Sequence, residues 1–182
     1  MKFLVVGLGN PEGKYFKTYH NVGFLAAETI ASQLGADFKK KGNQLVAKAG
    51  DVLILKPLTY MNLSGQAVLA VVRKHKIAPE NIIVIADDLY IEKGNVRISF
   101  GGSHGGHNGI RSINDLLRTN QYTKIRIGIK PEKPVHSQAN YVLSKINGDI
   151  ALDKAIQAAI DLLNSECLEK LQGMYNVKNS TQ

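Results

Sequence analysis

The sequence predicts an α/β fold, a single-domain three-layer sandwich in which helices flank a mixed, twisted β-sheet. Short apolar runs alternate along the chain with segments whose apolar residues recur at helical spacing, which is typical of α/β domains. A hairpin pattern near residue 50 adds antiparallel pairing, so we expect a mixed sheet rather than a purely parallel one. No repeat, low-complexity tract or linker-like segment interrupts residues 1–182, which we therefore expect to form one domain.

The expected elements follow one another in order. Continuous or alternating apolar runs predict strands at 2–8, 44–49, 52–57, 81–87, 95–100 and 123–130. Apolar residues at helical spacing predict helices at about 21–34, 64–76, 110–118 and 149–172. Ser64 is the expected cap of the second helix, because a serine side chain satisfies free N–H groups at a helix start.

Charge narrows the choice of partner. The formal net charge is +8, with 20 Lys and Arg against 10 Asp and Glu in residues 1–147 and 3 against 5 in residues 148–182. A cationic body with a mildly acidic tail suits a polyanionic partner, and nucleic acid is the first candidate. The alternative is a basic surface that serves solubility alone.

Cysteine usage and hydropathy indicate a cytoplasmic protein without a membrane segment. The single cysteine, Cys167, excludes an internal disulfide and a Cys-based zinc site. No apolar stretch approaches the ~20 residues that a membrane span requires. The apolar N-terminal run leads into Asn-Pro-Glu-Gly rather than a small-residue cleavage site, which predicts a first strand and not a signal peptide.

Two glycine-rich segments invite cofactor hypotheses. GLGNPE (7–12) lacks the third glycine of a dinucleotide fingerprint, so a turn presenting Asn10 is the preferred interpretation. In GGSHGGHNG (101–109), His104 and His107 would need a third metal ligand that the sequence does not name. No Gly-Lys-Ser/Thr follows to make a phosphate loop. We therefore expect no metal and no cofactor, and a loop in which Asn108 and exposed backbone groups contact a chain-like substrate.

His20 and one of the two aspartates of ADDLY (86–90) are the candidate catalytic pair. His20 stands just before the helix predicted at 21–34, whose N-terminal partial positive charge should keep the imidazole neutral and able to act as a general base. Asp87 and Asp88 stand at the end of a predicted strand, and one of them is a candidate for the carboxylate that orients this base. The alternative for His20 is a polar helix cap without chemistry, and the alternative for the two aspartates is an exposed turn. No serine occupies a Gly-x-Ser-x-Gly elbow and Cys167 lies in a predicted amphipathic helix, so water is the expected nucleophile.

Five motifs in order resemble the bacterial-type peptidyl-tRNA hydrolase family. They are GLGNP (7–11), TYHN-x-G (18–23), KP-x-TYMN-x-SG (56–65), DDL (87–89) and GG-x-HGGHNG (101–109), and RIGI (126–129) and NYVLSK (140–145) also match. The resemblance implies a cytoplasmic, metal-free, monomeric enzyme with no membrane partner. It also implies cleavage of the ester that joins a peptide to the 3′ ribose of tRNA.

The resemblance also implies roles for individual residues. His20 is the implied base and Asp87 its partner, while Asn10 is implied to position His20 and to distinguish N-blocked peptidyl esters from free aminoacyl esters. The implied substrate-binding residues are Tyr15, Tyr60, Asn62, Asn108 and His107. Basic residues that cluster in sequence around the glycine loop are the candidate contacts to nucleic acid, or else a solvated face: Arg97, Arg111, Lys124 and Arg126.

The chain departs from the family pattern at four positions. Tyr19 stands where the family usually has Arg, Glu12 replaces a glycine, Tyr90 replaces an Asp, and Ser99 falls where a basic residue is common. Two rival functions remain open at this stage. One is an RNA-binding module that does not hydrolyse, and the other is a hydrolase of a small ester, whose activity would be insensitive to salt.

Overall fold

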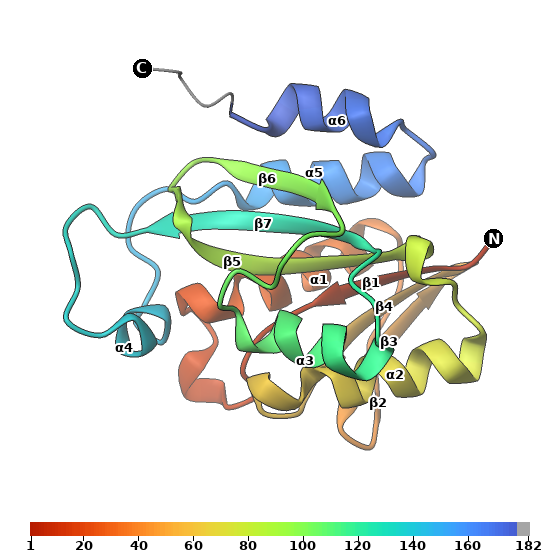
Figure 1. The fold of residues 1–182 in the computed structure, drawn as a ribbon. Helices are drawn as coiled ribbons and strands as arrows, with labels where there is room; N and C mark the ends of the chain where they lie inside the picture. The colour runs from red at the N-terminus through yellow and green to blue at the C-terminus, as the bar shows by residue number, and fades with distance from the viewer. Residues whose placement is uncertain (178–182) are drawn as a thin grey trace.

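A computed structural model describes residues 1–177 and shows a seven-stranded mixed sheet between two helical layers (Figure 1). The strands are β1 (Phe3–Gly7), β2 (Lys39–Lys41), β3 (Gln44–Ala49), β4 (Val52–Pro57), β5 (Ile82–Glu92), β6 (Val96–Phe100) and β7 (Thr123–Lys130). The helices are α1 (Val22–Gln33), α2 (Ser64–His75), α3 (Asn108–Leu117), α4 (Gln138–Val142), α5 (Leu152–Leu163) and α6 (Leu168–Tyr175). Short 3-10 helices are η1 (Gly13–Tyr15), η2 (Tyr19–Asn21), η3 (Met61–Leu63) and η4 (Pro79–Asn81). The predicted α/β class is confirmed.

The strand order β2-β3-β4-β1-β5-β7-β6 places the parallel strands β4, β1, β5 and β7 in the middle of the sheet. Antiparallel strands β3 and β2 extend one edge, and antiparallel β6 closes the other. Parallel strands end at the same edge of a sheet, so the segments that follow β1 and continue β5 lie near each other. Ligand sites in open α/β sheets form at this edge.

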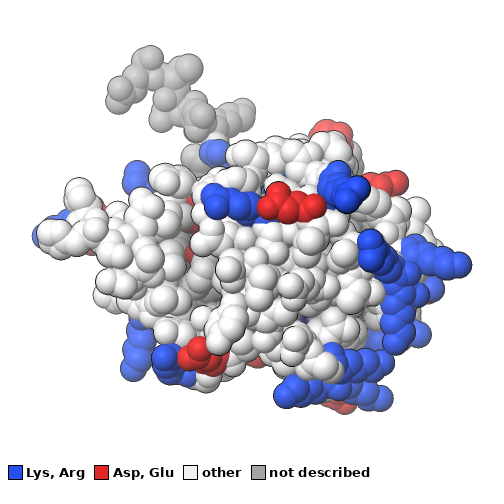
Figure 2. Space-filling model, turned by 60° about the horizontal axis from the view of Figure 1, so that its bottom comes forward, with Lys and Arg blue, Asp and Glu red and all other residues white. Residues whose placement is uncertain are grey.

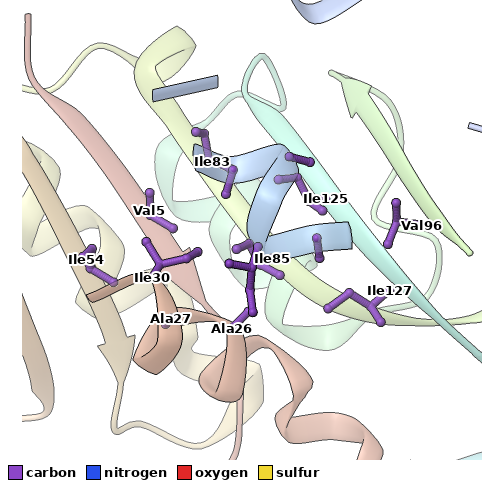
Figure 3. Packing of buried hydrophobic residues seen from close by; sticks show 14 of the residues in the cluster. Val5, Ala26, Ala27, Ile30, Ile54, Ile83, Ile85, Val96, Ile125 and Ile127 are labelled. Atoms are coloured by element: carbon purple, nitrogen blue, oxygen red, sulfur yellow. The ribbon is translucent and has the colours of Figure 1, made fainter. Parts of the chain in front are cut away.

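Both faces of the central strands are buried, and alternate residues point to opposite layers. On one face Val5 and Ile85 pack against α1 and α5, as Figure 3 shows for the centre of this cluster. On the other face Leu4 and Val84 pack against α2 and α3. This two-sided burial explains why the central strands read as continuous apolar runs.

Gly23 brings α1 into close contact with the sheet. A Cβ at this position would lie 2.5 Å from the backbone nitrogen of Leu8 and nearer still to the carbonyl oxygen of Ile85. Only glycine leaves room for this approach. The start of α1, and with it η2 and His20, is therefore held directly against the end of β1 and the first half of β5.

Several boundaries differ from the sequence predictions. β5 continues past Asp87 to Glu92, because Asp88 still pairs with Gly128 of β7. The single helix predicted over 149–172 is two helices, α5 and α6, with Ser165 at φ +66° between them. Ser64 is the first residue of α2 and not its cap, since its hydroxyl donates to the carbonyl of Met61. Strand β2 and helix α4 were not predicted.

Within the described residues, no helix has both the length and the apolar character that crossing a membrane requires.

Candidate active site

Three side chains from distant parts of the sequence meet at the carboxyl edge of the sheet. His20 Nδ1 lies 2.9 Å from Asp87 Oδ1 and 3.0 Å from Oδ2, and His107 Nε2 lies 2.9 Å from the same Oδ1. His20 lies in η2, which follows β1, and Asp87 lies in the middle of β5. His107 is the residue just before α3. The side chains of Asp87 and His107 are only 3% and 8% exposed, whereas that of His20 is 15% exposed.

The backbone fixes the tautomer of His107. Its Nδ1 accepts hydrogen bonds from the backbone N–H groups of Gly109 and Ile110, at 3.1 and 3.4 Å. A ring nitrogen that accepts cannot carry the proton, so the proton of a neutral His107 sits on Nε2 and is donated to Asp87. Asp87 also accepts from His20 Nδ1–H, which leaves His20 Nε2 as the ring nitrogen with a free lone pair.

The two imidazoles keep Asp87 ionised in a buried place. Burial alone would raise the pKa of Asp87, but the charges and hydrogen bonds of His20 and His107 hold it well below its usual range. For His20, burial lowers the pKa, and the adjacent Asp87 carboxylate outweighs that effect and raises it. The adjacent carboxylate therefore has a larger effect on the pKa of His20 than the burial that opposes it, and this effect is opposite in direction to the one expected from a helix N-terminus.

The same three side chains are the one group of metal-type ligands among residues 1–177, with their ligand atoms within 4.8 Å of one another. The hydrogen bonds argue for a proton network rather than a metal centre. A metal on His107 Nε2 would require that nitrogen to give up its proton while Nδ1 goes on accepting from the backbone, which leaves an unfavourable imidazolate. The ligand set fits a metal poorly.

His20, Asp87 and His107 open into a cavity of about 220 Å³. Its other walls come from the end of β5, from the glycine loop and α3, from Arg126 of β7, and from α4, which supplies Gln138, Ala139 and Val142. None of the described residues that line the cavity is a serine, threonine or cysteine. The site therefore offers a base and its orienting carboxylate beside a space for substrate and water.

Comparison with known proteins identifies the family. The family model for peptidyl-tRNA hydrolase matches residues 4–182. This chain belongs to the peptidyl-tRNA hydrolase family. A peptidyl-tRNA hydrolase of Prosthecochloris aestuarii is 38% identical, with 98% of each chain covered, and one of Sulfurihydrogenibium is 42% identical over 90% of this chain and 87% of its own.

Solved structures of peptidyl-tRNA hydrolases share the fold. A crystal structure of such an enzyme in complex with N-propanol has a TM-score of 0.82 and 32% identity, and covers 99% of this chain and 97% of that one. The enzyme from Acinetobacter baumannii has a TM-score of 0.77 and 34% identity, and covers 95% of this chain and 89% of its own. This protein is accordingly a hydrolase of the peptidyl-tRNA hydrolase family.

Asn10, implied by the family resemblance to position His20, is connected to it only indirectly. The Asn10 backbone pairs with the buried side chain of Asn21, donating to Oδ1 at 2.7 Å and accepting from Nδ2 at 2.9 Å. The Asn10 side chain accepts from the Glu12 N–H at 3.1 Å. Asn21 thus ties the turn after β1 to the residue next to His20, a role that sequence analysis missed.

The implied substrate-binding residues occupy different places around the site. Asn108 and His107 both line the cavity, and His107 is also hydrogen-bonded to Asp87. Asn62 is exposed on η3, which packs against α3. Tyr60, 64% exposed, precedes η3, and the half-buried Tyr15 ends η1. Neither tyrosine nor Asn62 lines the cavity in this conformation.

The four basic residues predicted to contact nucleic acid differ in their exposure to solvent. Lys124 is fully buried, and its ammonium donates to the carbonyls of Gly101 and Asn120, so the prediction that it contacts nucleic acid is corrected. Burial, together with Arg126, lowers the pKa of Lys124 to about 8. Arg126 lines the cavity, with Nη1 3.5 Å from Asp88 Oδ2. Arg97 and Arg111 are exposed on β6 and α3.

Proposed function

We propose that this protein hydrolyses the ester between a peptide, or an N-blocked aminoacyl group, and the 3′ ribose of tRNA, with His20 as the general base and Asp87 as its orienting partner. The observation that carries the proposal is the double hydrogen bond between His20 Nδ1 and the Asp87 carboxylate. It leaves Nε2 as the one proton acceptor of a ring that lines the cavity.

The steps balance with water as the only other reactant. Water oxygen attacks the ester carbonyl carbon while His20 Nε2 takes its proton, and the carbonyl oxygen becomes an oxyanion. The carbon–oxygen bond to the ribose then breaks, and the imidazolium returns the proton to the departing 3′ oxygen. Asp87 stabilises the imidazolium between these two events. The products are a peptide carboxylic acid, which releases the second proton of the water to solvent and becomes a carboxylate, and tRNA with a free 3′ hydroxyl.

Polar groups at the cavity supply recognition that does not depend on peptide sequence. An asparagine amide both donates and accepts, which matches a peptide backbone. Asn108 stands at the cavity wall, where it can donate to the ester carbonyl, and Asn62 lies on the neighbouring η3. A donor aimed at a developing oxyanion is worth about 10²–10³ in rate. The hydrogen-bonded state of His107 supports chemistry without a metal.

His107 has a second role beside the substrate binding that the resemblance implies. Its ring is held by two backbone N–H groups and donates to Asp87, so it acts as a positioning residue for the carboxylate. Its centroid lies 4.9 Å from that of His20. The carboxylate is therefore fixed from both sides before any substrate enters.

The experiment is hydrolysis of N-acetyl-aminoacyl-tRNA beside the same aminoacyl-tRNA left unacetylated. We expect rapid release of the N-acetylated amino acid and little release of the free one. Cleavage of neither would favour an RNA-binding module without catalysis. Equal cleavage of both esters, or cleavage of small esters at a rate that salt does not change, would favour a general esterase.

A further inference from the structure

Five lysines form a second cationic surface away from the candidate active site. They are Lys2, Lys39, Lys41, Lys48 and Lys74, all exposed, and we call them the distal basic patch. Figure 2 shows Lys and Arg side chains gathered on the right of the molecule, the side where the N-terminus lies in Figure 1.

The patch and the candidate active site lie toward opposite ends of the central strands. Lys2 directly precedes β1, whereas His20 follows the end of that strand. Lys48 pairs with Leu53 near the start of β4, and Lys74 lies in the last turn of α2. At ~3.3 Å per residue the five residues of β1 alone span about 17 Å. A partner that contacts both places has to be extended.

The lysines of the patch lack acidic partners in the part of the chain that the structure describes. Within residues 1–177 none of the five forms an ion pair with a carboxylate. Lys39, Lys41 and Lys48 line one groove of about 350 Å³ together with His75. Asp37 is the one acidic residue described in its walls. Burial and then the charges of Lys74, Lys2, Lys48 and Lys41 lower the pKa of His75.

We propose that the distal basic patch binds the phosphate backbone of the double-helical part of the RNA whose 3′ end occupies the candidate active site. The inference rests on the proposed function and extends it by naming a second contact. A tRNA substrate is an extended polyanion, so its duplex can reach the patch while its 3′ end stays in the cavity. Neutralising phosphates with lysine releases counterions and strengthens binding at low salt.

The chemistry of the patch favours an RNA backbone over other partners. Lysine is a point charge that suits phosphate and carries no base specificity. Among the described large apolar side chains, Met1 is the one exposed beside the patch, so base stacking and membrane insertion have little support. Lysine is also depleted at protein–protein interfaces, which disfavours a protein partner.

The test compares two double variants that remove the same charge. The patch variant is Lys41→Gln with Lys48→Gln. The matched control is Lys154→Gln with Lys170→Gln. Lys154 is exposed on α5 and Lys170 on α6, and α5 covers the face of the sheet opposite to α2. Binding of uncharged tRNA is measured across a salt series. Hydrolysis is measured on N-acetyl-aminoacyl-tRNA and on the same ester of a CCA trinucleotide.

We expect the patch variant to lose on the order of tenfold in affinity for whole tRNA at low salt, with a salt slope smaller by about 2, since each phosphate contact contributes ~0.9. The control should stay within about twofold. All three proteins should cleave the trinucleotide ester equally. Equal losses in both variants, or no loss in the patch variant, would overturn the proposal. If the wild type cleaved neither ester, the proposed function would fail, and the tRNA-binding comparison would still decide whether the patch binds RNA.

Discussion

Asp87 accepts hydrogen bonds from two imidazoles at once, and this arrangement explains how a buried carboxylate remains charged. Breaking such a buried network by removing one partner is costly, because the remaining charge loses its compensation. The network also assigns each ring a task. His107 is locked by backbone donors, whereas His20 keeps one nitrogen free at the cavity. The proposed hydrolysis therefore depends on one proton acceptor, His20 Nε2, that is held in a single orientation.

The pH dependence of the rate follows from the same contacts. His20 acts as a base only when it is neutral, so the rate falls as pH drops through its pKa, which Asp87 raises above the ordinary value of 6.5. In Asp87→Asn the raising charge is gone while burial still lowers the pKa. We expect the acid limb of the kcat–pH profile to move to lower pH, and the plateau rate to fall by about 10² or more.

The measurement is a kcat–pH profile of both proteins on N-acetyl-aminoacyl-tRNA. An acid limb that stayed in place, or moved to higher pH, would show that the carboxylate does not set the pKa of the base.

One close contact between helix α1 and the sheet holds η2, and with it His20, next to Asp87. Gly23 lies against the backbone of Leu8 and Ile85, and a methyl group there has no room. The glycine of the TYHN-x-G motif is thus a packing residue rather than a turn residue. It fixes the distance between the base and its carboxylate, since η2 directly precedes α1.

Gly23→Ala tests this contact, with Gly173→Ala as the matched control. We expect Gly23→Ala to reduce the free energy of unfolding by about 1–3 kcal/mol through overpacking, and to lower kcat because η2 shifts from β5. Gly173 lies in α6 with nothing within 4 Å of an added Cβ, so its alanine variant should be neutral or slightly stabilising. Urea unfolding and kcat are the readouts, and equal effects in both variants would contradict the packing argument.

Elements with strong periodicity could be predicted from the sequence, whereas those set by tertiary contacts could not. The buried parallel strands and α1 to α3 have apolar patterns that fix their type. Strand β2 consists of three exposed lysines, and only its pairing with β3 makes it a strand. Helix α4 has no buried residue, and its place beside the cavity depends on contacts such as Tyr141 donating to Ile129.

In the candidate site, too, some features could be predicted from the sequence and others depend on tertiary contacts. His20 and Asp87 are 67 residues apart, and in the sequence only the family resemblance selects Asp87 as the partner of His20. The role of His107 depends on its two backbone donors, for which the sequence carries no signal. Lys124 is a charged residue within a predicted strand, and only the fold shows that its side chain is buried and that its ammonium donates to the carbonyl of Gly101 in the glycine loop.

Across the whole molecule, the site lies at the carboxyl edge of the sheet and the distal basic patch at the other end. The Lys and Arg side chains behind the net charge of +8 are therefore not spread evenly over the surface. In the two proposals, the capture of a long polyanion depends on salt, while the chemical step depends on one imidazole. Substrate binding and ester cleavage should accordingly respond to different variants.

The measurement that tests the central claim most directly is single-turnover hydrolysis of N-acetyl-aminoacyl-tRNA by the wild type and His20→Ala, with folding checked by circular dichroism. The account predicts a rate lower by at least about 10² in the variant, the lower range for losing a general base, with binding of tRNA retained. A folded His20→Ala protein that cleaved this ester at close to the wild-type rate would contradict the account.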